Sequence, residues 1–222
     1  MHSLMFPTTI VDDFLHEPFQ YVKLANALQY ERDKDGRWPG LRTENLVINY
    51  PDMVHRVVKK IMSLYYNLYC FEQEYVNWHV TAYFQKVSSN YNKGWIHSDI
   101  GNQLTSIIYF CESGLGTSIF RPKEILNFKG IINSKEKYES YKNIEKINEL
   151  SRYREENNNQ FIKTITVDSC FNRLLCFEGG HPHGVDNFEN EDNNLDRLTL
   201  ILFISKIVPA NCFPIERSKF SL

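Results

Sequence analysis

The sequence lacks the features that would divide the chain or place it in a membrane. Its 222 residues contain no Pro/Gly/Ser-rich linker, so we expect one domain over residues 1–222. No apolar run approaches the ~18 residues that a membrane helix requires. The first residues, MHSLMFPTTIVDD, lack a basic region followed by an apolar stretch and a small-residue cleavage site, which argues against a secretory signal. We therefore expect a soluble, cytoplasmic protein.

An excess of charge of one sign and a paired set of cysteines are missing as well. The formal net charge of -2, with both signs mixed, provides no basic surface for nucleic acid. The cysteines are single and odd in number, without Cys-x-x-Cys spacing, which argues against a disulfide framework or a structural zinc site: Cys70, Cys111, Cys170, Cys176 and Cys212. Aromatic residues are plentiful at 14%, which favours a core of strands.

Apolar periodicity predicts scaffold helices first, over about residues 14–69, and then a catalytic core over about residues 75–207. Apolar residues recur at helical spacing in Phe14–Tyr30 and again from Pro51 to about Tyr69. From Tyr75 the period becomes two, and the polar face of that strand would either meet solvent or floor a pocket. Further strands are predicted at Leu104–Cys111, Thr117–Phe120, Phe161–Val167, Arg173–Phe177 and Leu198–Ile207.

A charged, Asn-rich insert over about residues 124–160 interrupts the predicted strands. We expect part of it to be helical and its NNN end to be a loop, with disorder of the whole segment as the alternative. Its size suggests a lid or a surface for a partner.

Two histidine motifs carry candidate metal ligands. In His97-Ser98-Asp99, residues i and i+2 of a strand would present a nitrogen and an oxygen to one point, although a histidine hydrogen-bonded to an aspartate is the simpler interpretation. A second imidazole from His181-Pro182-His183, after a Gly-rich turn, would complete a two-His, one-carboxylate set, which leaves three positions on iron(II) open. Histidines on a polar loop are the alternative here.

A third motif follows in Arg197-Leu198-Thr199. On a strand, Arg197 and Thr199 share a face, so a guanidinium fork and a hydroxyl would point together, and such a fork is suited to a carboxylate. The simpler alternative is an arginine at a strand edge that faces water.

In this order, HSD, NRLLCFEGGHPHGV and RLT resemble the motifs of the Fe(II)- and 2-oxoglutarate-dependent dioxygenases. The segments TAYFQK, LTSIIYFCE and PHGV look like the prolyl-hydroxylase-type branch, and the resemblance covers about residues 75–205. It implies a mainly β fold with flanking helices, a double-stranded β-helix of the jelly-roll, cupin-like kind.

The resemblance also implies roles for individual residues. The implied iron ligands are His97, Asp99 and His183. The implied contacts of 2-oxoglutarate are Arg197, on its distal carboxylate, with Thr199, Tyr83 and Tyr109. His181 competes with His183, but Phe177-x-Gly-x-x-x-His183 followed by Gly-Val fits the pattern better. The long acidic loop from Asp186 to Asp196 widens the usual spacing to Arg197.

The implied reaction consumes O2 and 2-oxoglutarate, releases succinate and CO2, and hydroxylates a C–H bond, with ascorbate as a stimulant. The carboxylate of Asp99 favours hydroxylation, because halogenating relatives lack it. The wording favours a prolyl residue of a peptide or protein, or a free amino acid, as substrate, and the candidate wall residues are Trp95, Arg121 and Asp35–Arg42. The alternatives are a cupin-like metal or small-molecule binding protein without turnover, and an interaction protein without metal.

Overall fold

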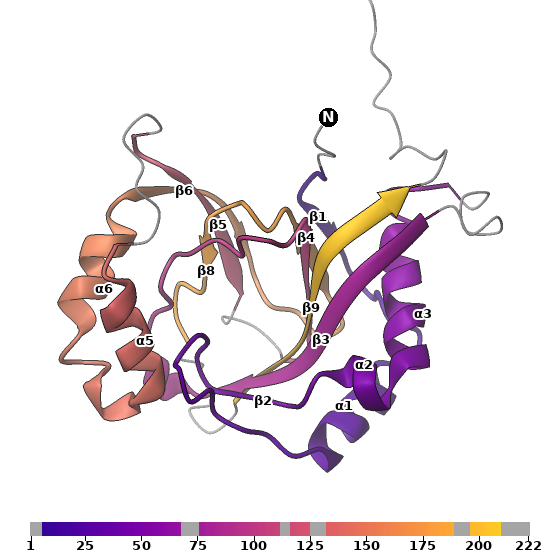
Figure 1. Cartoon of the computed structure of the whole chain (residues 1–222), viewed down its shortest axis with the longest axis horizontal. Coiled ribbons are helices and arrows are strands. Elements are labelled where there is room, and N and C mark those ends of the chain that lie inside the picture. Colours follow the sequence, from indigo (N-terminus) through magenta and orange to yellow (C-terminus); the bar gives the residue numbers. More distant parts are fainter. Residues whose placement is uncertain (1–5, 68–75, 112–115, 125–131, 189–195, 210–222) are drawn as a thin grey trace, which may run out of the picture.

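The computed structural model describes residues 6–67, 76–111, 116–124, 132–188 and 196–209 as a two-sheet β structure with flanking helices (Figure 1). The larger sheet has the order β1-β7-β4-β9-β3-β2 and the smaller one β6-β5-β8, with antiparallel pairing between neighbours. The strands are β1 (Thr9–Val11), β2 (Leu41–Arg42), β3 (Val76–Val87), β4 (Leu104–Tyr109), β5 (Thr117–Pro122), β6 (Phe161–Val167), β7 (Leu174–Phe177), β8 (His183–Gly184) and β9 (Arg197–Pro209).

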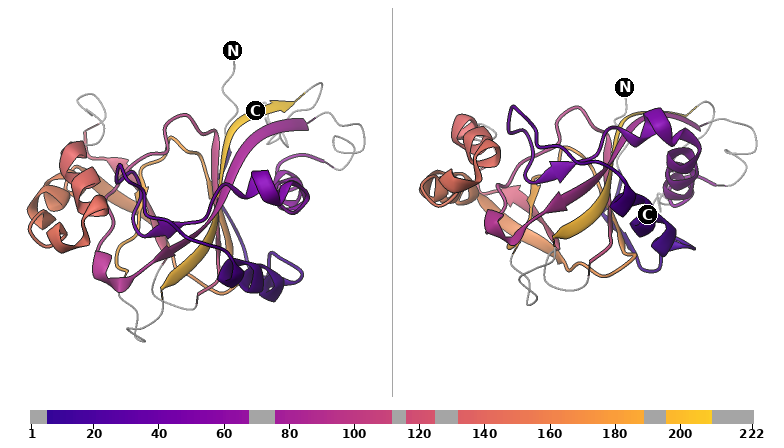
Figure 2. Two further views of the ribbon diagram at one scale, coloured as in Figure 1. Left: turned by 60° about the horizontal axis from the view of Figure 1, so that its bottom comes forward. Right: turned by 90° about the horizontal axis from the view of Figure 1, so that it is seen from below.

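Helices lie at both ends of the molecule. The α-helices are α1 (Pro18–Ala27), α2 (Leu46–Asn49), α3 (Pro51–Met62), α5 (Ser134–Lys142) and α6 (Ser151–Asn158), and the short 3-10 turns are η1 (Ser89–Tyr91) and η2 (Ile144–Lys146). Helices α1 and α3 lie beside the larger sheet, and α5 and α6 lie at the opposite end of the molecule (Figures 1 and 2). In the described part of the chain, no helix has both the length and the apolar character needed to cross a bilayer.

Strand β9 separates the scaffold core from the interior of the two-sheet structure. Its residues Leu198, Leu200, Leu202 and Ile204 belong to the large apolar core that also contains the buried stripe of α3. The alternate positions Arg197, Ile201 and Phe203 line a cavity on the other face of the sheet. This is the two-residue period of an extended strand, with one apolar face and one that can carry polar groups.

The neighbouring strand β3 repeats this arrangement and answers a question that its sequence leaves open. Residues Thr81, Tyr83 and Gln85 line the cavity, so this part of the polar face floors a pocket. Before the register shift between His79 and Val80, the same face is exposed at Asn77 and His79. Both expectations for the polar face are therefore met, each on its own half of the strand.

Helix α3 shows the predicted amphipathic stripe. Pro51 occupies its first turn, where the absent N–H costs nothing. The stripe buries Val54, Val57, Val58, Ile61 and Met62 against the large sheet, and leaves Lys59 facing outward. Helix α1 falls inside the predicted 14–30 range, with Pro18 in its first turn.

We expect Ile61→Ala to lower the free energy of unfolding by about 2–5 kcal/mol, because it leaves a void in a packed core. Ile61 is fully buried under the sheet. The matched control is Ile48→Ala, at a side chain that is 62% exposed on α2; it should change stability by about 0.5 kcal/mol or less. Urea unfolding of both variants measures the difference, and equal losses would place the core elsewhere.

The insert over residues 124–160 corrects one prediction. Its described part, from residue 132, folds into α5, η2 and α6, so neither disorder nor an Asn-rich loop describes it. Asn157 and Asn158 are the last residues of α6. The fully buried Asn157 side chain donates to the Ile96 carbonyl oxygen at 3.0 Å and accepts from the Ile132 N–H at 3.2 Å. These contacts, which tie the insert to the main fold, make the helical ending favourable.

The predicted strands are present within two residues of their predicted ends, whereas β1, β2 and β8 were missed. These three contain only two or three residues, which is too short for a periodic pattern. Some predictions fall outside the described residues: Cys70 and Cys212, the helix end near Tyr69, the strand start at Tyr75, residues 125–131 of the insert and residues 189–195 of the acidic loop.

Candidate metal centre and cavity

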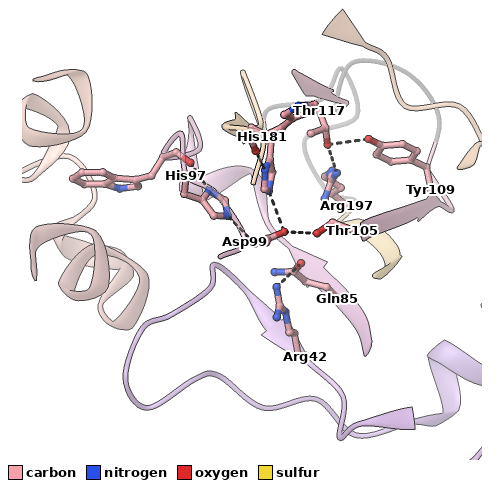
Figure 3. Close-up of polar contacts among 11 residues, drawn as sticks. Arg42, Gln85, His97, Asp99, Thr105, Tyr109, Thr117, His181 and Arg197 are labelled. Carbon is pink, nitrogen blue, oxygen red and sulfur yellow. Dashed lines mark hydrogen bonds and ion pairs between the residues drawn. The ribbon is translucent and has the colours of Figure 1, made fainter. Parts of the chain in front are cut away.

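Two histidines and one aspartate from distant parts of the chain converge at the start of β8. The ligand atoms of His97, Asp99 and His183 lie within 4.8 Å of one another. A pair of backbone hydrogen bonds brings the two histidines together, from His97 N–H to the His183 carbonyl at 2.9 Å and from His183 N–H to the His97 carbonyl at 2.8 Å. Figure 3 shows the side chains of His97 and Asp99 next to each other. The structure thus gathers the three predicted ligands in one place.

The local backbone differs from the predicted strand. His97 forms only an isolated bridge, and Asp99 lies outside the named strands, so a regular i, i+2 alternation is not what orients the pair. The Asp99 N–H donates to the Gly179 carbonyl at 2.7 Å instead. A Cβ at Gly179 would lie 2.4 Å from the Asn102 carbonyl oxygen, so this close approach requires glycine. The two-residue strand β8 is too short to extend a ladder to Asp99.

Hydrogen bonds set the tautomers of both imidazoles. His97 Nδ1 lies 2.8 Å from the Trp95 carbonyl oxygen, and His183 Nδ1 lies 2.9 Å from the His181 carbonyl oxygen. Because carbonyl oxygens only accept, each Nδ1 carries a proton, and a ring that is neutral in this arrangement presents its lone pair at Nε2. Burial, with the positive charge of Lys137, lowers the pKa of His97 well below its ordinary value, so this imidazole is neutral at physiological pH.

The Nε2 atoms of both histidines face a carboxylate. Nε2 of His97 lies 3.8 Å from Asp99 Oδ1, and Nε2 of His183 lies 3.4 Å from Asp99 Oδ2. The Thr105 hydroxyl donates to Asp99 Oδ2 at 2.8 Å and fixes that side chain. A metal cation between these groups would bind both imidazole nitrogens and the carboxylate. Two imidazoles, one carboxylate and their hydrogen-bonded supports fit a divalent transition metal such as iron(II).

His181, the competing ligand, lies outside this cluster. Its Nε2 is 3.7 Å from Glu178 Oε2, and its side chain is 45% exposed. Its contribution to the cluster is through the backbone, because its carbonyl oxygen accepts the proton of His183 Nδ1. Among the described residues, the geometry therefore favours His183 over His181 as the third ligand.

A second cluster surrounds Arg197 at the start of β9. Arg197 Nη2 donates to Thr117 Oγ1 at 3.3 Å, and the same oxygen accepts from the Tyr109 hydroxyl at 2.8 Å. The guanidinium carbon lies 5.2 Å from the centre of the Tyr109 ring. Burial raises the pKa of Tyr109, so its hydroxyl stays protonated as a donor. Thr199, on the same strand, is fully buried, and its hydroxyl has no hydrogen-bond partner in the described part of the chain.

One cavity of about 590 Å³ joins the two clusters. It is lined by His97, Asp99, His183, Arg197 and Tyr83 from the predicted set, whereas Tyr109 and Thr199 are not part of its lining. Its other walls include Trp95 and the loop residues Arg37, Trp38, Pro39 and Arg42, as predicted from the Asp35–Arg42 segment.

The predicted wall residue Arg121 is exposed and lies outside the cavity lining. A register shift between Ile119 and Phe120 breaks the strict alternation of β5, so Arg121 does not continue the inward face of Thr117 and Ile119. The prediction for Arg121 was wrong for this reason.

Several residues of the cavity were not predicted as functional. Thr105 and Thr117 lie near the starts of β4 and β5 and form hydrogen bonds with Asp99 and Arg197. Their hydroxyl groups at strand ends are the sequence signal that could have identified them. Lys137 comes from α5 of the insert and Gln85 from β3, and both line the cavity. The insert thus forms a wall, since Tyr138 and Tyr141 of the same helix also line it.

Comparisons with known proteins were made for sequence and for fold. The sequence matches a family described as "Family of unknown function (DUF6445)" over residues 4–204. A search of curated proteins found no match. A similar solved structure is HygX from Streptomyces hygroscopicus with nickel and 2-oxoglutarate bound, with a TM-score of 0.53, 11% identity, and coverage of 91% of this chain and 82% of that one.

Two further structures are more distant. The non-heme alpha ketoglutarate dependent epimerase SnoN from nogalamycin biosynthesis has a TM-score of 0.49, 10% identity, and coverage of 91% of this chain and 80% of that one. A prolyl 4-hydroxylase from Phytophthora capsici has a TM-score of 0.43, 11% identity, and coverage of 89% and 58%. At such identities the likeness concerns the fold, and the predicted jelly-roll, double-stranded β-helix class is confirmed.

Proposed function

Because the chain belongs to the DUF6445 family, whose function is unknown, we propose its activity from the site: it is an Fe(II)- and 2-oxoglutarate-dependent dioxygenase that hydroxylates a C–H bond. The observation that carries this proposal is the shared cavity, in which the His97, Asp99 and His183 cluster and the buried Arg197 face one space. HygX, which has a similar fold, was crystallised with nickel and 2-oxoglutarate, a pair of ligands that matches these two clusters in chemistry.

In this proposal His97, Asp99 and His183 hold the metal, and their supports keep them oriented. The carbonyl oxygens of Trp95 and His181 keep the Nε2 lone pairs turned inward. When bound, iron(II) with 2-oxoglutarate and O2 would supply the oxidant for C–H hydroxylation, with release of succinate and CO2. Three protein ligands leave room for this chemistry, because half of an octahedral sphere stays open.

Arg197 would bind the distal carboxylate of 2-oxoglutarate through its planar fork. Thr117 and the ring of Tyr109 hold the guanidinium in place, and Thr199, two residues further along β9, offers a buried hydroxyl. Tyr83, on the cavity floor, is the remaining proposed contact of the cosubstrate. These groups position the cosubstrate and exclude water from it, because Arg197, Thr117 and Thr199 are all buried.

The substrate class proposed from the prolyl-hydroxylase-like sequence motifs is a prolyl residue of a peptide or protein, or a free amino acid. The cavity is of the size that small-molecule sites have, roughly 300–1,000 Å³, and its walls of Trp38, Trp95 and Tyr141 suit an apolar ring or chain. The second candidate, a cupin-like binding protein without turnover, explains the metal cluster but gives no role to Arg197.

We expect anaerobically reconstituted protein to convert 2-oxoglutarate to succinate when iron(II), O2 and ascorbate are supplied, because uncoupled turnover needs no primary substrate. Succinate measured by mass spectrometry is the readout. The control is the same protein reconstituted with zinc, which has no redox chemistry and should produce no succinate. Tight metal binding without any succinate above the zinc control would favour the binding protein.

A further inference from the structure

Arg42 lines the cavity, with three aromatic rings near its guanidinium and one long hydrogen bond from its N–H edge. Its guanidinium carbon lies 4.5 Å from the centre of the Trp38 ring, 5.3 Å from that of Phe203 and 5.6 Å from that of Tyr83. Its hydrogen bond to Gln85 Oε1 is long, at 3.5 Å, and its buried Nε has no acceptor among the described residues. Figure 3 shows Arg42 and Gln85 on one side of Asp99, with Arg197 on another. The N–H groups of Arg42 thus have only one weak acceptor among the side chains of the described residues.

Lys137 brings a second cation to the same cavity from the insert. Its residue is only 5% exposed, and its Nζ lies 5.9 Å and 5.8 Å from the rings of Tyr138 and Tyr141. Burial lowers the pKa of Lys137 to about 8 and that of Arg42 to about 10, while the carboxylate of Asp99 raises both. Both side chains thus remain charged near pH 7, and the charge of Arg42 contributes to the lowered pKa of Lys137.

Neither cation has an ionic partner in the part of the chain that the structure describes. Arg37, on the same wall, is different, because Asp33 binds its Nε at 3.0 Å and its Nη2 at 2.8 Å. Burying a charge is costly unless it is paired. Within its described part, the fold pairs Arg37 with a carboxylate but gives none to Arg42 or Lys137. A bound anion would supply the missing partner for these two charges.

The packing of the loop on the insert keeps the two cations in place. Gly36 lies so close to α5 that a Cβ there would be 1.9 Å from the Tyr138 carbonyl oxygen. The Gln85 side chain donates to the Pro39 carbonyl at 2.7 Å and so ties the same loop to β3. The wall that contains Arg42 and the wall that contains Lys137 are therefore in direct contact.

Charge balance indicates what these cations would bind. If the proposed function holds, the two positive charges of iron(II) and the one of Arg197 are balanced by the two negative charges of 2-oxoglutarate and the one of Asp99. Arg42 and Lys137 then remain as the cavity's uncompensated charges, since Arg37 is paired with Asp33. The last occupant of the cavity should bring the missing negative charge.

We propose that Arg42 and Lys137 form an oxyanion subsite that selects a small substrate bearing a carboxylate or phosphate group. The inference rests on the proposed function for the word substrate, and on the geometry alone for the anion site. The stacked fork of Arg42 suits two oxygens of one group, and Lys137 adds a point charge. A free amino acid or another small acid fits this subsite, whereas a prolyl residue inside a peptide has no such group.

The binding test uses sulfate as a probe of the subsite, in protein loaded with manganese and saturating 2-oxoglutarate so that Arg197 is occupied. By calorimetric titration, Arg42→Gln and Lys137→Gln should each weaken sulfate binding by about 10- to 150-fold, as expected for a lost hydrogen bond to a charged group. The matched control is Arg37→Gln, which removes a paired cation from the same wall and should leave sulfate affinity within about 2-fold. Circular dichroism confirms that each variant is folded.

Two outcomes would overturn the subsite: wild-type protein that does not bind sulfate, or variants at both positions that bind it as tightly as the wild type. Loss of 2-oxoglutarate affinity in Arg42→Gln, with sulfate binding unchanged, would also overturn it, because Arg42 would then belong to the cosubstrate. The same titration without metal and 2-oxoglutarate separates the two proposals. If the protein bound sulfate through Arg42 but never bound 2-oxoglutarate, the proposed dioxygenase activity would be wrong and the proposed anion site would stand.

A turnover panel identifies the anionic group. Free amino acids are compared with their carboxamides, and phosphomonoesters with their parent alcohols, as stimulants of succinate formation. We expect one acidic series to stimulate turnover at least about 10-fold more than its neutral partner, and Arg42→Gln to abolish that preference. Neutral analogues that work as well as the acids in wild-type protein would contradict the selection of an anionic substrate.

Discussion

Asp99→Ala is expected to weaken the binding of iron(II) or manganese(II) by more than about 100-fold, because loss of groups that merely orient metal ligands already costs about 10- to 100-fold. The carboxylate is the only anionic group in the cluster, and without it two neutral imidazoles would have to hold a dication. His97→Ala and His183→Ala should have effects of the same order, and all three should abolish succinate formation. Metal content after anaerobic reconstitution, with calorimetric titration of manganese, measures the loss.

Two variants calibrate this result. His181→Ala removes the neighbouring imidazole, whose side chain lies outside the cluster, and should leave metal affinity largely intact. Thr105→Val keeps the shape but removes the hydroxyl that donates to Asp99, so it should cost about 10- to 100-fold in affinity. If His181→Ala lost the metal and His183→Ala kept it, the choice of third ligand would be wrong.

Arg197→Ala is expected to weaken 2-oxoglutarate binding by about 2–5 kcal/mol, the range for breaking a buried, hydrogen-bonded charge pair. The guanidinium is buried between the Thr117 hydroxyl and the Tyr109 ring, so no solvent replaces the lost contact. Arg197→Lys should recover only part of the affinity, because an ammonium keeps the charge and loses the fork. Anaerobic titration of 2-oxoglutarate into manganese-loaded protein measures both variants.

Metal affinity provides the internal control for Arg197, since the Arg197 side chain is not among the groups that converge on the metal cluster and manganese binding should change far less than 2-oxoglutarate binding. Arg37→Gln is the matched control for removal of a cation from the cavity, and it should leave 2-oxoglutarate affinity unchanged. A folded Arg197→Ala protein with wild-type affinity would show that the cosubstrate is held elsewhere. Arg42 would then be the first residue to test, since Arg121 lies outside the cavity.

Much of the fold could be predicted from local sequence patterns. The stripe of α3 and the alternation of β9 depend on the 3.6-residue and two-residue periods of the backbone, which any sufficiently long element displays. Strands β1, β2 and β8 escaped prediction because elements of two or three residues have no period and are specified by the strand beside them. The helical end of α6 escaped for a related reason, because Asn157 is held by Ile96 and Ile132, which are distant in sequence.

The candidate site, too, was determined in part by the sequence and in part by the tertiary structure. The sequence by itself determined which residue types were available for a metal and a carboxylate, because His-x-Asp, a later histidine and Arg-x-Thr are local motifs. The motif pattern favoured His183 over His181, and only the tertiary structure shows the backbone bridge between His97 and His183 that brings His183 into the cluster.

The tertiary structure alone also excluded Arg121 and brought Lys137 into the cavity, where it joins the predicted wall residue Arg42. These positions depend on a register shift in β5 and on the packing of a loop against the insert, at Gly36 and Tyr138. The contact of Gly36 with Tyr138 joins residues 102 positions apart, and the shifted pairing of β5 joins Phe120 to Lys163, 43 positions apart. Their geometry is set by the whole fold, whereas a motif is set by a few neighbouring residues.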